Sequence, residues 1–148
     1  MTRYELLLFL HLLAAFATVA SVVLFVTVLI GSRRATTAAD ALPLLRISNL
    51  AALLWNVGGL AVLVFGVWLA LDLDGYELWD GWIVAAIVLW VVASAAGDPL
   101  SRRYRNAVDQ GGDAALAMLR ASRTVALHVV MAGAILALLV DMIFKPGA

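Results

Sequence analysis

The sequence contains no cysteine, and charged residues make up only 14% of its 148 residues. Without cysteine the chain can form no disulfide, thiolate metal site, iron–sulfur cluster or thioether-linked haem. It also has no glycine-rich phosphate loop, no nucleophile beside a base at motif spacing, and no ligand cluster typical of zinc or calcium. The sequence therefore favours a non-enzymatic protein, and it predicts no metal site and no nucleic-acid partner.

Apolar residues make up 65% of the chain, and the mean hydropathy of +1.03 lies well outside the range of soluble domains. They gather in four stretches, 6–30, 50–71, 82–97 and 124–144. Each is near the roughly 20 residues that a helix needs to cross a bilayer. We predict an all-α, polytopic membrane protein, an antiparallel up-down bundle of four transmembrane helices forming a single domain over residues 1–148.

Local sequence features set the expected helix boundaries at about 4–32, 44–72, 80–97 with an extension to about 109, and 113–144. The first stretch resembles a secretory signal, but its apolar run continues to Arg33, so we expect it to be retained. Asp40 and Pro43 mark the start of the second helix, and Asp98-Pro99 predicts a kink or restart in the third. Gly111-Gly112-Asp113 predicts a break and a cap before one long last helix, whose first ten residues would project into the cytoplasm.

The basic residues are segregated along the chain. Three of the ten lie between the first two helices and five between the last two, whereas the loop at 72–80 is acidic and has none. By the positive-inside rule, both termini face outward and the basic loops face the cytoplasm. This pattern predicts a multi-pass protein of the bacterial cytoplasmic (inner) membrane, with an outer aromatic belt of Tyr4, Tyr76, Trp79 and Trp82.

Small and weakly polar residues predict where the helices pack, because membrane helices associate through close backbone approach and hydrogen bonds. One stripe on the first helix contains His11, Ala14, Ala15, Thr18, Ser21 and Phe25. The later helices offer Asn56, Gly59 and Gly66, then Ala86, Ala93 and Gly97, then Ala126, Gly133 and Ala137. Asn56 is expected to bond Thr18 or Ser21, or alternatively to line a transport or proton path.

Four ionisable residues lie at membrane depth and are functional candidates, His11, Asp98, His128 and Asp141. His11 and His128 differ in expected depth by roughly 15 Å, which is too far for two axial ligands of one iron. Depth instead pairs His11 with Asp141 near the outer face and Asp98 with His128 near the inner face.

Each candidate also has a structural interpretation. Asp98 is a good N-cap and is positioned to pair with Arg102 or Arg123, and Asp141 precedes Lys145 by four residues. His128 fits a second packing seam or an interfacial position. For His11, the alternatives are a core side chain satisfied by a hydrogen bond, or a ligand or proton carrier.

The segment "FLHLLAAF" and the closing "MAGAILALLVDMIFKPGA" resemble an uncharacterised family of small bacterial integral membrane proteins, the domain-of-unknown-function family numbered twenty-two sixty-nine. That resemblance implies a four-helix fold. The "FLH" start also resembles copper-resistance D-type membrane proteins and the four-helix bacterial protoporphyrinogen oxidase, whose first-helix histidine is implicated in haem binding. Only His11 matches that motif, since Ala14, Ala15, Phe16 and Ala17 replace the tryptophan–glycine pattern that often follows it.

Three functions follow from these observations. The first is a non-catalytic helical scaffold, an accessory subunit or a self-associating protein in the lipid bilayer, with a second copy or another membrane protein as its partner. The second is a redox protein that binds haem b through His11, with Met142 as a second ligand, which predicts a Soret absorbance. The third is an oligomeric carrier of protons or small solutes that uses the polar groups around Asn56.

Overall fold

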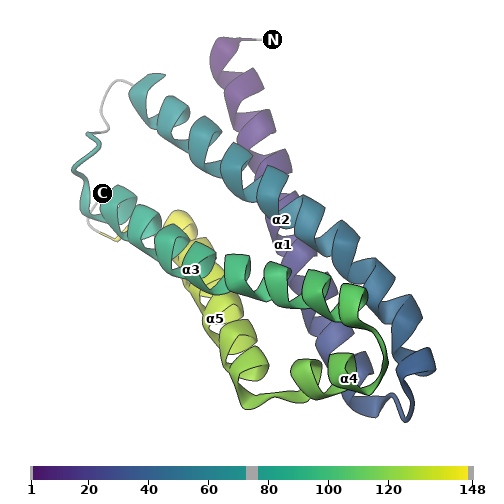
Figure 1. The fold of residues 1–148 in the computed structure, drawn as a ribbon. Coiled ribbons are helices and arrows are strands. Elements are labelled where there is room, and N and C mark those ends of the chain that lie inside the picture. The colour runs from purple at the N-terminus through teal and green to yellow at the C-terminus, as the bar shows by residue number, and fades with distance from the viewer. Residues whose placement is uncertain (1, 73–76, 147–148) are drawn as a thin grey trace.

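The computed structural model describes residues 2–72 and 77–146, and throughout that part the secondary structure is helical (Figure 1). The helices are α1 (Arg3–Arg34), α2 (Ala38–Asp72), α3 (Gly81–Gln110), α4 (Gly112–Arg120) and α5 (Ser122–Phe144). All of them except α4 are long and apolar enough to cross a membrane. The predicted all-α fold with four spanning helices is therefore confirmed, and the chain is a multi-pass membrane protein.

The four long helices form two pairs. α1 packs most extensively on α2, and α3 packs most extensively on α5. The two pairs meet near α4 and diverge toward the end of the bundle that carries both termini (Figure 1). Both chain ends therefore lie at the end opposite α4.

The first pair is held together by close backbone approach. A Cβ added at Gly58 of α2 would lie 3.0 Å from Thr18 Oγ1, and one added at Gly31 of α1 would lie 2.5 Å from Leu44 Cδ1. The predicted stripe on α1 is confirmed, because its members are buried or half-buried, namely His11, Ala14, Ala15, Thr18, Ser21 and Phe25. α1 itself starts at a capping box in which Thr2 and Glu5 bond each other's backbone N–H.

α2 begins six residues before its predicted start. Asp40 N–H donates to Thr37 Oγ1 at 3.3 Å, and Thr37 N–H donates to Asp40 Oδ2 at 2.9 Å. This reciprocal capping starts the helix ahead of Pro43, which lies inside it. Because Pro43 has no N–H, it cannot bond the Ala39 carbonyl one turn before it, and α2 lacks one backbone hydrogen bond there.

α3 runs without interruption through Asp98-Pro99, so the restart predicted there does not occur. The carboxylate that was expected to cap a new helix instead accepts a hydrogen bond from α2. The buried face of α3 also continues past the proline at helical spacing, through Ala93, Gly97, Leu100, Tyr104 and Ala107. Packing along this whole face favours one continuous helix.

The prediction of one long last helix is wrong, because the chain breaks at Ala121, whose ψ is 140°. α4 packs on the bundle and buries Ala115, Leu116 and Leu119, so it is not the projecting extension that was predicted. Arg120 donates to the Ala35 carbonyl after α1, which fixes the turn. The predicted break at Gly111 and Gly112 is confirmed, with φ of 61° and 60°, but Gly111 rather than Asp113 is the cap residue.

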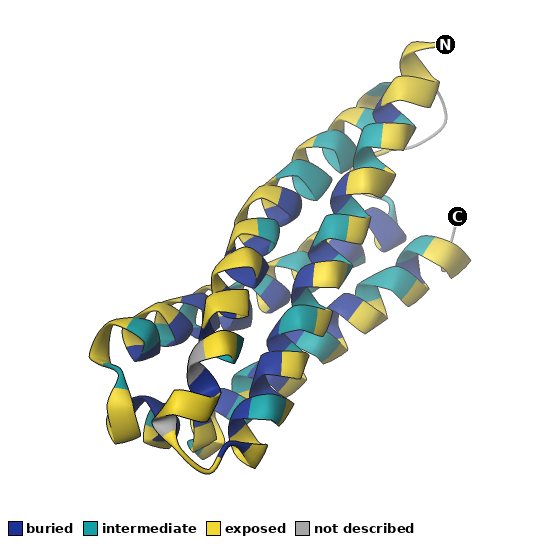
Figure 2. Ribbon diagram, turned by 90° about the vertical axis from the view of Figure 1, so that its right-hand side faces the viewer, coloured by how far each residue is buried: buried dark blue, intermediate teal, exposed yellow. Residues whose placement is uncertain are grey.

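The small-residue seam predicted on α5 is also wrong. Ala126, Gly133 and Ala137 are exposed, whereas the opposite side of α5 faces the core with His128, Met131, Ala134 and Ile135. Figure 2 shows this division of each long helix into a buried and an exposed side. The larger side chains fill the space beside Tyr104 and Phe25, which small residues would leave empty.

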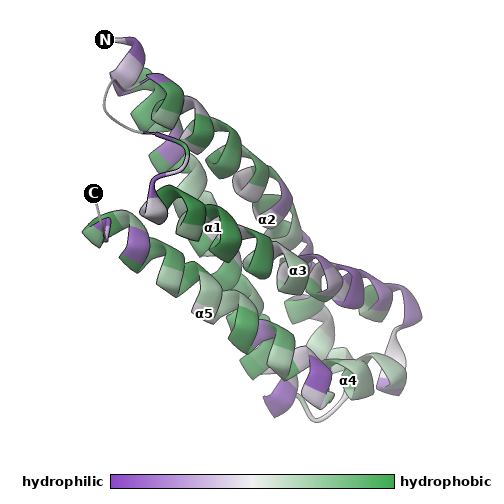
Figure 3. Cartoon of the chain, turned by 90° about the vertical axis from the view of Figure 1, so that its left-hand side faces the viewer, coloured by the Kyte–Doolittle hydropathy of each residue, from purple (hydrophilic) through white to green (hydrophobic). Residues whose placement is uncertain are grey.

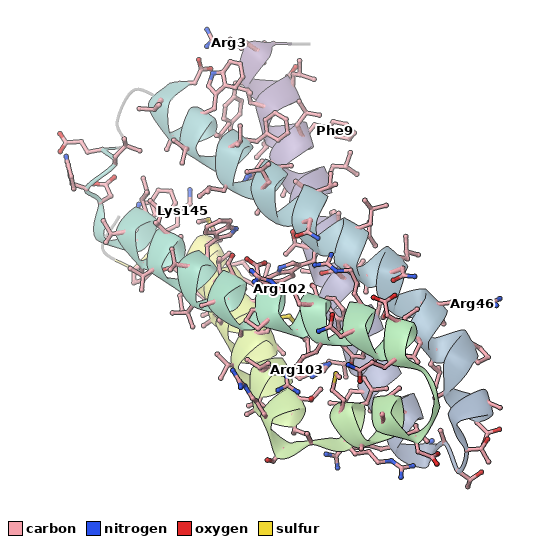
Figure 4. All side chains as sticks on the ribbon, in the orientation of Figure 1. Arg3, Phe9, Arg46, Arg102, Arg103 and Lys145 are labelled. Atoms are coloured by element: carbon pink, nitrogen blue, oxygen red, sulfur yellow. The ribbon has the colours of Figure 1, made fainter. Side chains whose placement is uncertain are left out.

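Large apolar side chains make up most of the exposed surface in the spanning parts of the long helices, as a lipid-facing surface requires. Phe9 and Phe16 of α1 are exposed, and Figure 4 shows Phe9 pointing away from the other helices. Of the expected aromatic belt, Tyr4 and Trp79 are exposed, but Trp82 is buried against Ala70 and Ile83. Tyr76 lies outside the described residues.

Candidate functional site

His11 is half-buried between α1 and α2. Its Nδ1 lies 3.0 Å from the Val62 carbonyl oxygen, and its ring packs on Gly66, where an added Cβ would lie 2.9 Å from His11 Cε1. A carbonyl oxygen can only accept, so Nδ1 carries the proton, and in the neutral ring Nε2 carries the lone pair. The geometry thus provides the hydrogen bond that the structural interpretation of His11 requires.

Asp98 joins α3 to α2 through an indole. Trp55 Nε1 donates to Asp98 Oδ1 at 3.2 Å, and the Trp55 ring lies flush against Gly97. A second hydrogen bond joins the same two helices with the donor on α3, since Trp90 Nε1 donates to the Gly59 carbonyl of α2 at 3.0 Å. The expected pairing of Asp98 with Arg102, Arg123 or His128 is therefore replaced by a bond to α2.

His128 lies in a buried polar cluster with Tyr104 and the backbone of α1. Its Nδ1 is 2.7 Å from the Thr124 carbonyl oxygen, and its Nε2 is 3.0 Å from Tyr104 Oη and 3.2 Å from the Phe25 carbonyl oxygen. Tyr104 also stacks on Phe25, with ring centroids 5.4 Å apart. The cluster therefore links α1, α3 and α5 at one point.

The direction of these hydrogen bonds follows from the acceptors. Both ring nitrogens of His128 face carbonyl oxygens, but the contact from Nδ1 to Thr124 is the shorter, 2.7 Å against 3.2 Å from Nε2 to Phe25. We therefore assign the proton of the neutral ring to Nδ1, which leaves Nε2 to accept the proton of the Tyr104 hydroxyl. Tyr104 and His128 are 1% and 2% exposed. Burial of this degree leaves no room for a substrate, so we interpret the cluster as a structural contact that holds α1, α3 and α5 together.

Asp141 and Met142 lie near the C-terminal end of α5. Asp141 is buried, and within the described residues its Oδ2 has no hydrogen-bond partner. His11 bonds Val62 and not Asp141. The Lys145 backbone N–H donates to the Asp141 carbonyl at 2.8 Å, and the Lys145 ammonium lies 5.0 Å from the centroid of the Trp82 ring. Met142 packs against Ala70, Trp82 and Ile83. His11 and Met142 therefore have separate neighbours, and haem b binding through them stays a prediction.

Asn56 is exposed, which differs from its expected place in a seam with α1. Its amide nitrogen donates to the Ala52 carbonyl of its own helix at 2.7 Å. Thr18 and Ser21, the expected partners, bond the Ala14 and Thr18 carbonyls of α1 in the same way. Local bonds satisfy these hydroxyls, so nothing draws Asn56 toward α1.

The α4 end of the bundle carries a groove of about 440 Å³, which we call the arginine groove and which is lined by Pro99, Arg102, Arg103, Asn106, Met118 and Arg123. Arg103 Nη1 donates to Thr124 Oγ1 at 3.3 Å. Figure 3 shows that hydrophilic residues gather at this end, and in Figure 4 Arg102, Arg103 and Arg46 lie nearer to it than Arg3 and Lys145 do.

Sequence reasoning missed Tyr104, because it stands within the basic segment "LSRRYRNAV". The helical spacing from Ala93 through Gly97 and Leu100 to Tyr104 was the one pattern that pointed to its burial. Over residues 2–72 and 77–146, no three His, Asp or Glu side chains come together as a metal-binding group.

Three features are thus candidates for function: the exposed carboxamide of Asn56, the buried polar cluster of His128 and Tyr104, and the arginine groove. Comparison of the chain with protein-family models, with curated proteins and with solved structures found no match.

Proposed function

We propose that this chain is a non-catalytic membrane scaffold that self-associates through the exposed face of α2. The observation that carries the proposal is Asn56, a carboxamide at the centre of a membrane-spanning helix and on its exposed side. Its nitrogen bonds Ala52, but its oxygen accepts no hydrogen bond from the described residues. Hydrocarbon offers no donor, so an acceptor left there costs free energy that a neighbouring helix would recover.

The residues around Asn56 suit contact with a second copy. Asn49, Leu53, Asn56 and Leu60 follow one another at intervals of four, three and four, and all are exposed. This is the spacing of a seam between two helices, in which a buried asparagine can fix the register. Two copies in one membrane share their orientation, so their α2 helices run parallel and the two Asn56 side chains meet across a two-fold axis.

Asn56→Leu is expected to weaken the dimer roughly 5- to 30-fold, the effect of one interhelical hydrogen bond worth about 1–2 kcal/mol. Energy transfer between donor- and acceptor-labelled copies in lipid vesicles, at several protein-to-lipid ratios, measures the dissociation constant. The control is Thr27→Val on the exposed face of α1, where the hydroxyl bonds its own helix. Unchanged energy transfer in Asn56→Leu, with loss in Gly133→Leu, would place the contact on α5 and contradict the proposal.

We also propose that the α4 end faces the cytoplasm of a bacterium and that both termini face outward across its inner membrane. The support is the concentration of arginines in the loops and helix ends at that end. Figure 3 shows hydrophilic residues gathered there. Because the chain lacks cysteine, one introduced thiol reports a single position. A membrane-impermeant maleimide should label Glu77→Cys but not Ser122→Cys in intact spheroplasts, and the reverse pattern would invert the orientation.

A carrier function receives less support. The polar groups that were expected to form a path are bonded separately, His11 to Val62, Asp98 to Trp55 and His128 to Tyr104. No hydrogen bond among the described residues connects one of these groups to the next. The self-association proposal is preferred because it uses a group that the fold leaves unsatisfied.

A further inference from the structure

The arginine groove contains cationic groups that the fold does not use. Two other arginines at this end bond the backbone, since Arg33 donates to the Arg120 carbonyl at 3.4 Å and Arg120 donates to the Ala35 carbonyl. Within the described residues, Arg102 and Arg123 make no hydrogen bond or ion pair, and Arg103 bonds only the Thr124 hydroxyl. Three guanidinium groups therefore converge on one groove without a carboxylate partner.

The N-terminus of α5 adds a second positive contribution. Its N-cap residue is Ala121, and no side chain caps the first turn. Arg123, which lines the groove, lies in that turn. The unpaired N–H groups at the start of a 23-residue helix carry the positive end of its dipole, which favours an anion.

The groove has apolar walls as well as cationic groups. Pro99 and Met118 line it beside the arginines, so its ligand has an anionic part and an apolar part. α5 is about 34 Å long at the usual helical rise, close to the thickness of the hydrocarbon core. Arg123, at its start, is therefore at the depth of lipid phosphates.

We propose that the arginine groove binds the phosphate of an anionic glycerophospholipid, whose acyl chains lie along Pro99 and Met118. Planar guanidinium groups bind phosphate oxygens through paired hydrogen bonds, and basic pockets between membrane helices suit such head groups. This site is distinct from the α2 face and does not depend on self-association.

The test uses the full chain, purified and stripped of lipid in a zwitterionic detergent. Binding of short-chain phosphatidylglycerol, phosphatidylcholine and inorganic phosphate is measured by thermophoresis. We expect phosphatidylglycerol to bind at least 10-fold more tightly than phosphatidylcholine. Arg102→Gln with Arg123→Gln should weaken phosphatidylglycerol binding roughly 10- to 30-fold, at about fivefold per arginine.

The matched control is Arg34→Gln with Arg46→Gln, which removes the same charge from exposed positions outside the groove. It should change binding by less than about twofold. Should the groove variant fold poorly, Asn106→Asp places a carboxylate among the arginines without removing one, and it should also weaken binding. Equal losses in both double variants, or no preference over phosphatidylcholine, would overturn the proposal. Phosphate alone competing at the same concentration would identify a free-anion site and overturn it too.

Discussion

Gly97→Ala is expected to destabilise the fold by about 3 kcal/mol, although it adds one methyl group. The new Cβ would lie 2.3 Å from Trp55 Cζ2 and 2.4 Å from Trp55 Cε2. The indole is 4% exposed and is fixed by its bond to Asp98, so it cannot move aside without losing that bond. The midpoint of thermal unfolding in detergent, followed by helical circular dichroism, measures the effect.

Gly133→Ala serves as the control for this change. A Cβ at Gly133 meets no atom within 4 Å, so the same chemical substitution should leave the midpoint unchanged or raise it slightly. Replacing Trp55 with the smaller valine should remove most of the clash. In a Trp55→Val background, Gly97→Ala should therefore lower the unfolding midpoint only slightly. A full penalty in that background would mean that the clash with Trp55 is not the cause.

His128→Leu is expected to cost about 3 kcal/mol, because it leaves the Tyr104 hydroxyl buried and without its strongest partner. The Thr124 carbonyl also loses the Nδ1 donor. Tyr104→Phe should cost less, about 1–2 kcal/mol, because it removes a hydroxyl and retains the ring that stacks on Phe25.

The two substitutions are expected to be coupled, because each removes one partner of the same 3.0 Å hydrogen bond. In unfolding by denaturant, the double variant should be more stable than the sum of the single effects predicts by about 1 kcal/mol or more. Thr27→Val, which removes an exposed hydroxyl bonded to Val23, should be close to neutral. Strict additivity of His128→Leu and Tyr104→Phe would contradict the assigned hydrogen bond.

The sequence predicted the helices better than their partners, and the reason is physical. Hydropathy and length identify a membrane span without reference to other helices, so α1 was predicted within two residues at each end. The break at Ala121 depends instead on contacts far away in the sequence, such as the bond from Arg120 to the Ala35 carbonyl. No local pattern distinguishes that position from the middle of a helix.

The candidate site shows the same limit. The predicted depths placed His11 and His128 far apart, and in the structure His128 contacts Phe25, 14 residues after His11 on α1. Depth along a helix does not specify which side of the helix faces its neighbour. His128 was expected in a second packing seam or at an interfacial position, and it is buried in the core, where Tyr104 of α3 supplies its hydrogen bond. Only Trp79 and Trp82 were assigned a role, at the interface, and the sequence did not predict that Trp55 and Trp90 connect α2 to α3.

The pairing of α1 with α2 and of α3 with α5 has a consequence for biosynthesis. α1 and α2 follow one another directly in the chain, and only the short α4 separates α3 from α5. The first hairpin, with its contacts at Gly31, Gly58 and Gly66, is therefore complete before residue 81 leaves the ribosome. Segments that complete their contacts early during synthesis assemble as units, and long-range contacts follow. We therefore expect the two helix pairs to form first and to dock onto each other late. The hydrogen bonds of Trp55 and Trp90 between α2 and α3 form in that docking step.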